Sequence, residues 1–257
     1  MSIHPTAIVD PSAELGRSVS VGPYSIIGPH VVIGDDCWIG PHVVINGPTR
    51  IGTENRIYQF ASIGESPQDL KYAGEATLLE IGDRNTIREY ATIHRGTING
   101  GGVTRVGNDN FLMAYIHIAH DCTIGNRTVF ANNASLAGHV AIGNQVILSG
   151  FTLVHQFCSV GDHAFTGMGS AISKDVPPYL MVTGNPGHPH GINSKGLERR
   201  GISPEAVRAI KRAYKILYRS GLSLEEAKRE ISAMADKAEE LNLFSQFLGQ
   251  SRRSIIR

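Results

Sequence analysis

The 257-residue sequence has few cysteines and almost no net charge. Cys37, Cys122 and Cys158 form no CxxC pair, which argues against a disulfide framework and a thiolate metal site and favours a reducing compartment. The formal net charge is only +1, so the chain as a whole does not indicate a strongly charged partner, and we expect no nucleic acid to bind.

Signals for export or membrane insertion are also missing. The first residues, Met-Ser-Ile-His-Pro, contain no basic stretch followed by an apolar run. No segment approaches the about 18 uninterrupted apolar residues that a transmembrane helix requires. We therefore expect a cytoplasmic protein without a transmembrane segment, and its hydrophobic content of 41% is enough for a substantial core.

The most informative feature of the sequence is a six-residue repeat. Aliphatic residues occupy every sixth position at Ile3, Val9, Leu15, Val21, Ile27, Ile33, Ile39, Ile45, Ile51, Ile57 and Ile63. The series resumes over 81–93 and, after a slip of one residue, continues over 106–172. Such repeats are typical of parallel β-helices. We predict a left-handed parallel β-helix whose triangular coils, three hexads each, stack at the interstrand spacing of about 4.8 Å.

Two breaks in the repeat, near 64–80 and 95–105, predict loops that leave the coil. Loops ejected from a rigid solenoid commonly carry function, although tolerated surface insertions would look the same. The repeat ends near Pro177 and Pro178. We expect the β-helix to span 1–190 and a small helical domain to span 191–257.

Helical periodicity in the C-terminal part predicts three helices. Ser203 is a candidate N-cap for the first, and Ser223 with Glu226 three residues later forms a capping-box signature for the second. A third, short helix is expected over 241–248.

Five cations align on one face of the first of these helices. They are Arg208, Lys211, Arg212, Lys215 and Arg219, with no acidic residue interleaved. Residues 195–257 carry 14 Lys and Arg against 8 Asp and Glu, whereas 1–194 carry 10 against 15. A solvated helix face is the ordinary explanation, but this asymmetry also favours the docking of an acidic partner.

The coil length brings distant histidines to one wall of the β-helix. Residues one coil apart should stack, which places His120, Gly138 and Gln156 in one column and Asp121, His139 and Phe157 in the next. His155 joins the same wall. The group should therefore lie within about two strand spacings, or about 10 Å.

These residue types suggest acid–base chemistry. His120 beside the carboxylate of Asp121 is a candidate general base, and Gly138 offers a backbone N–H to an oxyanion. No Ser or Cys is placed for activation, which favours direct transfer without a covalent intermediate. A structural histidine ladder is the simpler alternative, and His139 and His155 suit an orienting or ligand-binding role equally well.

Clustered imidazoles also suit a catalytic zinc ion, which takes three protein ligands and keeps one position open. The chain would then be a metal-dependent hydratase, similar to trimeric carbonic anhydrases of this architecture. The segment His117-Ile-Ala-His120-Asp121 and the basic helical end fit that hypothesis less well. We expect neither a metal nor another cofactor.

Longer motifs resemble a known family over the whole chain. They lie at 57–64, 68–74, 92–97, 117–122, 131–134, 136–139, 154–158 and 199–201. The family is UDP-N-acetylglucosamine 3-O-acyltransferase, which begins lipid A biosynthesis. The resemblance implies a homotrimer with active sites between neighbouring coils, and transfer of an acyl chain from acyl carrier protein to the 3-hydroxyl of UDP-N-acetylglucosamine. Acyl carrier protein is acidic and would suit the basic helix.

The resemblance also implies roles for individual residues. The general base falls on His120, its supporting carboxylate on Asp121 and the oxyanion donor on Gly138. The nucleotide-sugar contacts fall on Gln68, Asp69, Lys71, His117, His139, His155, Gln156, Asn193, Arg199 and Arg200. The arginines suit a diphosphate because their planar guanidinium groups bind it bidentately. Lys195 stands where the family pattern leads us to expect an acidic residue.

In the resemblance, Met168 forms the floor of the acyl groove, where relatives that take a long chain have glycine. A methionine side chain adds four heavy atoms and should displace roughly four methylenes, each worth about 0.8 kcal/mol when buried. We expect a 3-hydroxyacyl donor of about ten carbons rather than about fourteen, unless the flexible Met168 side chain swings aside.

Two further alternatives are disfavoured by the sequence. A related N-acyltransferase would carry an extra domain before the repeats, which here start at Ile3. A noncatalytic or ice-binding solenoid would show flat, repetitive threonine-rich faces, and this sequence has none.

Overall fold

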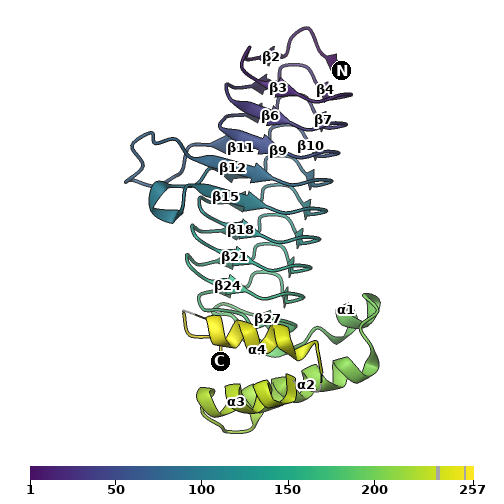
Figure 1. The fold of residues 1–257 in the computed structure, drawn as a ribbon, viewed down its shortest axis with the longest axis vertical. Helices are drawn as coiled ribbons and strands as arrows, with labels where there is room; N and C mark the ends of the chain where they lie inside the picture. The colour runs from purple at the N-terminus through teal and green to yellow at the C-terminus, as the bar shows by residue number, and fades with distance from the viewer. Residues whose placement is uncertain (236–237, 252) are drawn as a thin grey trace.

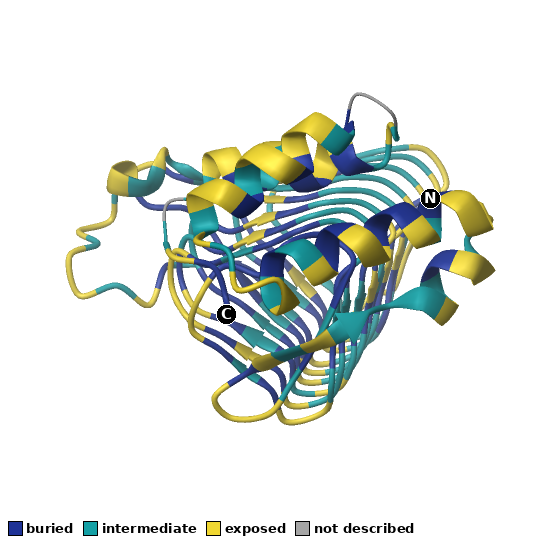
Figure 2. Ribbon diagram, turned by 90° about the horizontal axis from the view of Figure 1, so that it is seen from below, coloured by how far each residue is buried: buried dark blue, intermediate teal, exposed yellow. Residues whose placement is uncertain are grey.

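The repeat folds into a left-handed parallel β-helix with helices at its C-terminal end (Figure 1). The computed structural model describes residues 1–235, 238–251 and 253–257. Seen along its axis, the chain winds in superposed triangular coils, and the helices lie across one end (Figure 2). The predicted fold class is confirmed.

Three sheets form the sides of the prism. The first contains β1 (Ser2–Ile3), β4 (Ser20–Val21), β7 (Trp38–Ile39), β10 (Arg56–Ile57), β13 (Thr86–Ile87), β16 (Phe111–Leu112), β19 (Val129–Phe130), β22 (Ile147–Leu148), β25 (Phe165–Thr166), β27 (Leu180–Thr183) and β28 (His188–Ile192). The second contains β2 (Ile8–Val9), β5 (Ile26–Ile27), β8 (Val44–Ile45), β11 (Ser62–Glu65), β14 (Thr92–His94), β17 (His117–Ile118), β20 (Ser135–Leu136), β23 (Leu153–Val154) and β26 (Ala171–Ile172). The third contains β3 (Glu14–Leu15), β6 (Val31–Ile33), β9 (Thr49–Ile51), β12 (Leu78–Ile81), β15 (Val103–Val106), β18 (Thr123–Ile124), β21 (Ala141–Ile142) and β24 (Ser159–Val160).

Most hexads contribute one aliphatic side chain to the axis of the prism, and Phe130 and Thr166 take that place in two of them. In the second sheet, Ile27 pairs with Ile45 and Ile45 with Ile63, and none of the three is more than 1% exposed. Burying a side chain of this size stabilises the fold by about 1.5–3 kcal/mol, and similar contributions recur in most hexads. The period of six is therefore the period of the core.

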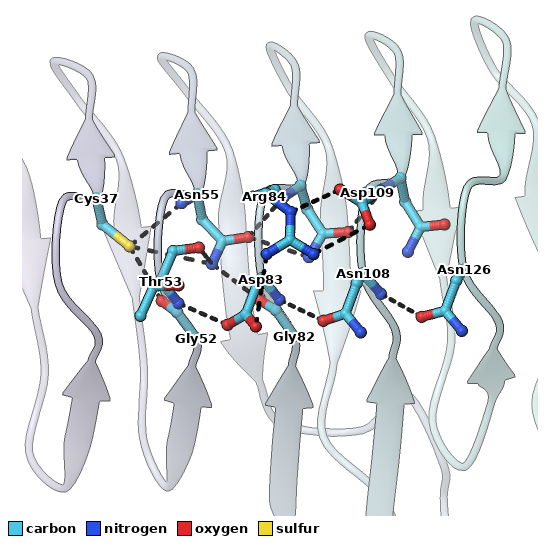
Figure 3. A network of polar contacts seen from close by, with 12 residues as sticks. Cys37, Gly52, Thr53, Asn55, Gly82, Asp83, Arg84, Asn108, Asp109 and Asn126 are labelled. Carbon is cyan, nitrogen blue, oxygen red and sulfur yellow. Dashed lines mark hydrogen bonds and ion pairs between the residues drawn. The ribbon is translucent and has the colours of Figure 1, made fainter.

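A polar ladder holds the coils together at the edge between the third and first sheets (Figure 3). The backbone N–H of Asp83 donates to Oδ1 of Asn108 at 2.7 Å, and that of Asn108 donates to Oδ1 of Asn126 at 2.7 Å. In each case, an asparagine side chain at the corner of one coil accepts a backbone N–H at the corner of the preceding coil. Such repetition makes the prism a rigid support for its edges.

Both breaks in the repeat become loops that leave the same edge, between the second and third sheets. They project side by side in Figure 1. The loops span 66–77 and 95–102, which is shorter than the expected 64–80 and 95–105. The reason is that β11 runs on to Glu65, β12 begins at Leu78 and β15 at Val103, where backbone pairing with neighbouring coils resumes. The second loop contains the 3-10 helix η1 (Ile98–Gly100).

The C-terminal part contains α1 (Ser194–Arg199), α2 (Pro204–Arg219), α3 (Leu224–Ala235) and α4 (Leu241–Gln250). Ser203 caps α2 by accepting the backbone N–H of Ala206, and Ser223 and Glu226 form the expected capping box. In the described ranges, no helix has both the length and the apolarity needed to cross a membrane.

Two elements of this part were not predicted. The strand β28 pairs antiparallel with β27, so the expected domain boundary at 190/191 falls inside a strand. The short helix α1 is capped by Asn193, whose side chain accepts the backbone N–H of Gly196. Beyond α4, the chain returns to the β-helix, where Ile255 forms a β-bridge with Asp175 of the last coil.

Candidate active site

The edge that carries both loops also carries the predicted histidines. His120 and Asp121 occupy the turn between β17 and β18, and Asp121 has the left-handed φ of 60° that this corner requires. Nδ1 of His120 lies 2.7 Å from Oδ2 of Asp121. Because a carboxylate accepts, Nδ1 carries the proton and Nε2 is left free to accept one. The imidazole is 14% exposed and the carboxylate is fully buried.

Residues of the second loop hold the carboxylate of Asp121. Thr97 donates its backbone N–H to Oδ1 at 2.8 Å and its hydroxyl to Oδ2 at 2.7 Å. The backbone N–H of Asp121 donates to the hydroxyl of Thr104 at 2.8 Å. Gly100 lies so close that a Cβ there would be 2.0 Å from Cγ of Asp121. Sequence reasoning missed the roles of Thr97, Gly100 and Thr104, although the loop near 95–105 was predicted.

The next coil stacks on this pair as the spacing predicts. Gly138 lies against His120, and a Cβ on Gly138 would be 2.6 Å from the imidazole, so only glycine leaves room for the ring. His139 meets the ring of His120 edge-on at 5.1 Å and stacks on Phe157 at 4.5 Å. Burial lowers the pKa of His139, which favours its neutral form.

A pocket of about 570 Å³ opens beside the pair. Its lining residues are Gln68, His117, Ala119, His120, Ser135, Leu136, Ala137, Gly138, Leu153, Val154, His155, Gln156, Ala171, Ile172 and Ser173. It follows the second sheet from β17 to β26, with His117 and His120 toward β17, His155 next to β23, and small or aliphatic side chains at β26. Six of the residues assigned to the site from the sequence therefore share one pocket.

A larger cavity of about 870 Å³ lies between the third sheet and α4. Gly100, His139, Phe157 and Arg253 are among its lining residues. We place the chemistry in the smaller pocket because that pocket contains His120 and Gly138.

His117 lines the pocket with an uncharged imidazole. Burial, with the nearby His94 and His120 contributing, lowers its pKa to about 4. Its Nδ1 lies 2.7 Å from the hydroxyl of Thr92, and the ring of His94 meets it edge-on at 5.0 Å. A histidine that stays neutral at pH 7 serves as a hydrogen-bonding group.

The first loop brings Gln68 to the pocket and is anchored by Arg95 of the second loop. The guanidinium of Arg95 donates to the carbonyl of Gly64 at 3.0 Å and to the hydroxyls of Ser66 and Tyr72 at 3.2 and 3.4 Å. Arg95 is 8% exposed. The segment over 68–71 therefore depends on a buried cation that sequence reasoning did not single out. Within that segment, the backbone N–H of Lys71 donates to Asp69.

Three predicted contacts lie elsewhere in the chain. Asn193 donates to the carbonyl of His163 at 3.4 Å, and Arg200 to Nδ1 of His163 at 3.2 Å. His163 occupies the turn between β24 and β25, at the edge between the third and first sheets. Burial lowers the pKa of Arg200. Arg199, like Lys195, is an exposed residue of α1.

Met168 lies at the remaining edge. It occupies the turn between β25 and β26, between the first and second sheets, and is 79% exposed. It is not among the residues that line the pocket of His120. One chain thus carries the predicted site residues on all three edges of the prism.

Sequence comparisons assign the chain to a family. The family "Udp N-acetylglucosamine O-acyltransferase; Domain 2" matches residues 175–256, and "Bacterial transferase hexapeptide (six repeats)" matches 30–65 and 104–138. The acyl-(acyl-carrier-protein)-UDP-N-acetylglucosamine O-acyltransferase of Thiobacillus denitrificans is 56% identical over 256 residues, covering 100% of this chain and 99% of the relative. The protein of the same name from a Janthinobacterium species is 59% identical, covering 99% of each.

The chain belongs to the UDP-N-acetylglucosamine O-acyltransferase family. It is therefore an acyltransferase, as the motifs predicted.

Solved structures agree with this assignment. The UDP-N-acetylglucosamine acyltransferase of Francisella novicida is 48% identical and superposes with a TM-score of 0.98, covering 99% of this chain and 94% of that one. The O-acyltransferase of Moraxella catarrhalis is 49% identical, also with a TM-score of 0.98, and the match covers 100% of both chains.

The basic face of α2 is exposed along its whole length in this member of the family. Glu205, which precedes the five cations in the sequence, pairs with Arg208 at 2.5 Å. Both side chains are more than half exposed, and such a surface ion pair contributes little to the stability of the fold. Lys211, Lys215 and Arg219 line a hollow of about 490 Å³ between α2 and β28, beside His190.

The geometry of His120 and Asp121 argues against the zinc hypothesis. Ligand atoms of His120, Asp121 and His139 lie within 4.8 Å of one another. Zinc, however, needs about 2.0–2.2 Å to each nitrogen or oxygen ligand, which holds tetrahedral ligands more than 3 Å apart. The 2.7 Å between Nδ1 of His120 and Oδ2 of Asp121 is the length of a direct hydrogen bond, so these two atoms are not placed as ligands of one zinc ion.

Proposed function

We propose that the chain transfers a 3-hydroxyacyl group from acyl carrier protein to the 3-hydroxyl of UDP-N-acetylglucosamine, the first step of lipid A biosynthesis. One observation carries this proposal. Nδ1 of His120 is bonded to the buried carboxylate of Asp121, while the same imidazole lines a pocket with Gln68 and His155. Full-length relatives of over 50% identity bear the name of this activity.

In the proposed reaction, Nε2 of His120 takes the proton of the sugar hydroxyl as the oxygen attacks the thioester carbonyl. A C–O bond forms, and the carbonyl oxygen becomes an oxyanion that accepts the backbone N–H of Gly138. Asp121 stabilises the imidazolium. Collapse then breaks the C–S bond, and the departing thiolate takes the proton back from His120.

Direct attack is favoured because no nucleophile is prepared for an acyl-enzyme. Burial raises the pKa of Cys122 to about 12 and that of Cys158 to about 11, and it also raises the pKa of Cys37. Ser135 lines the pocket, but its hydroxyl donates to the carbonyl of Asn133. A serine nucleophile would instead donate to a base.

We assign the nucleotide-sugar contacts to two groups. Gln68, Asp69, Lys71, His117, His139, His155 and Gln156 lie at the edge of His120, and Asn193, Arg199 and Arg200 lie near α1 on another edge. We propose a homotrimer in which one subunit presents its His120 edge to the α1 region of the next, so that the arginines reach the diphosphate. Lys195 would then add a positive charge near the same anion.

The acyl donor would approach α2. The exposed cations from Arg208 to Arg219 offer a surface of one sign to acidic acyl carrier protein, which would speed association and orient it. We infer that Met168, at the remaining edge, closes the acyl groove between subunits and limits the chain to about ten carbons. The protein would act in the cytoplasm.

The proposal is tested with purified protein, UDP-N-acetylglucosamine and 3-hydroxyacyl carrier proteins of different chain lengths. The expected product is an oxygen ester, cleaved by mild base, formed best from the donor of about ten carbons and unaffected by a metal chelator. An ester formed at a hydroxyl other than the 3-hydroxyl, or no ester from any donor, would contradict the proposed acceptor. Loss of activity with chelator and recovery with zinc would contradict the metal-free mechanism.

A further inference from the structure

The second loop closes directly over the carboxylate of Asp121. Thr97 is 4% exposed, and its hydroxyl and the imidazole of His120 both donate to the same oxygen, Oδ2, each at 2.7 Å. The backbone N–H of Thr97 donates to the other oxygen. The carboxylate therefore shares its charge among three donors, of which only one belongs to His120.

The loop is shaped for this contact. Thr97 caps the 3-10 helix η1, since its hydroxyl also accepts the backbone N–H of Gly100 at 3.2 Å. Gly100 in turn covers the carboxylate, where any Cβ would collide with it. An insertion of no function would not require a glycine against a buried carboxylate, so the loop has a role at the active site.

We propose that Thr97 is a positioning residue that sets the basicity of His120 by competing for Oδ2 of Asp121. This inference rests on the proposed role of His120 as the general base. A carboxylate oxygen that already accepts a strong hydrogen bond holds less charge for the imidazolium. Thr97 thus keeps His120 from binding its proton too tightly, while both hydrogen bonds fix the direction of the ring.

Other titratable groups face His120 and Asp121, and a substitution of Thr97 leaves these groups in place. His139 lies 3.8 Å from Oδ2 of Asp121 through its Nε2, and His94 and His117 are close enough to His120 to interact with its charge. Asp69 of the first loop faces His139. A shift caused by Thr97 is therefore measured against a constant background.

The test is the pH dependence of kcat/KM for the wild type, Thr97→Val, Thr97→Ser and Thr104→Val. Removal of the Thr97 hydroxyl should move the acidic limb of the profile to higher pH by about half to one unit, the scale of one ordinary hydrogen bond. Thr97→Ser keeps the hydroxyl and should restore the wild-type limb. Thr104→Val is the matched control, because Thr104 is fully buried and bonds the backbone of Asp121 but not its carboxylate.

An unmoved limb in an active Thr97→Val enzyme would overturn the inference, and so would an equal shift in Thr104→Val. If Thr97→Val does not fold, Thr97→Ala is measured in the same way and decides the question by the same criterion. The variant His120→Ala distinguishes a failure of the proposed general base from a failure of the proposed role of Thr97. Activity that survives in His120→Ala refutes the base and this inference together, whereas an inactive His120→Ala with an unmoved limb in Thr97→Val refutes only the role of Thr97.

Discussion

The guanidinium of Arg253 lies 2.9 Å from Nδ1 of His155, nearly a hundred residues away in sequence. Nδ1 also lies 3.2 Å from the carbonyl of Gln156, but arginine can only donate, and the same guanidinium donates to that carbonyl at 2.5 Å. Nδ1 is therefore the acceptor and Nε2 carries the proton. The C-terminal segment thus fixes His155 as a hydrogen-bond donor at the pocket.

Replacing Arg253 should weaken nucleotide-sugar binding. We expect Arg253→Met to raise KM for UDP-N-acetylglucosamine about three- to tenfold, the loss of one ordinary hydrogen bond, with kcat nearly unchanged. Arg257→Met is the control, because it removes the same charge from the same segment but bonds Leu222 instead. Equal KM values for the two variants would show that His155 needs no support from Arg253.

The burial of His117 predicts a loss of stability at mildly acidic pH. The unfolded chain protonates His117 near pH 6.5, whereas the folded chain resists protonation until about pH 4. Between these values the unfolded state binds more protons, so the free energy of unfolding should fall by about 1–3 kcal/mol as the pH is lowered from about 6.5 to about 4. His94, His139 and His163, whose pKa values are also lowered, act in the same direction.

Urea unfolding of wild type and His117→Asn at several pH values tests this prediction. The variant should lose part of the dependence, whereas His4→Asn, on the exposed first coil, should keep it all. Parallel curves for wild type and His117→Asn would contradict the assigned burial effect.

Met168 should determine the preferred acyl chain. Met168→Gly removes four heavy atoms and should shift the best donor from about ten carbons toward about fourteen, while Met168→Leu keeps the volume and should keep the preference. Competition between donors in one reaction, with products resolved by mass, gives the ratio directly. A preference unchanged in Met168→Gly would remove this residue from the groove.

Sites shared between subunits predict complementation. His120→Ala and Arg200→Ala subunits, inactive alone, should recover about a quarter of wild-type activity when they are co-expressed and mix at random in trimers. His120→Ala mixed with Asp121→Asn is the control, because both groups belong to one edge of one subunit and no intact site forms. No recovery in the first mixture would place Arg200 and His120 of the same chain in one site.

The positions that follow the six-residue repeat could be predicted from the sequence, whereas the contacts of the ejected loops and the C-terminal segment could not. Ile45 lies at the axis and Gly138 lies against His120 because every coil without an ejected loop has the same length, so position in the chain gives position in space. The roles of Thr97 and Arg95 could not be read in this way, since an ejected loop follows no fixed spacing. Arg253 reaches His155 only through the return of the C-terminal segment, a long-range contact that no local pattern records.

The proposed role of His120 as the general base is tested by kcat/KM of His120→Ala, measured beside His42→Ala, which alters an exposed histidine in the aromatic stack at another edge. We expect a fall of at least about 100-fold for His120→Ala, with little change in thermal stability, and wild-type activity for His42→Ala. A His120→Ala enzyme that is folded and within about threefold of wild type would show that His120 is not the general base.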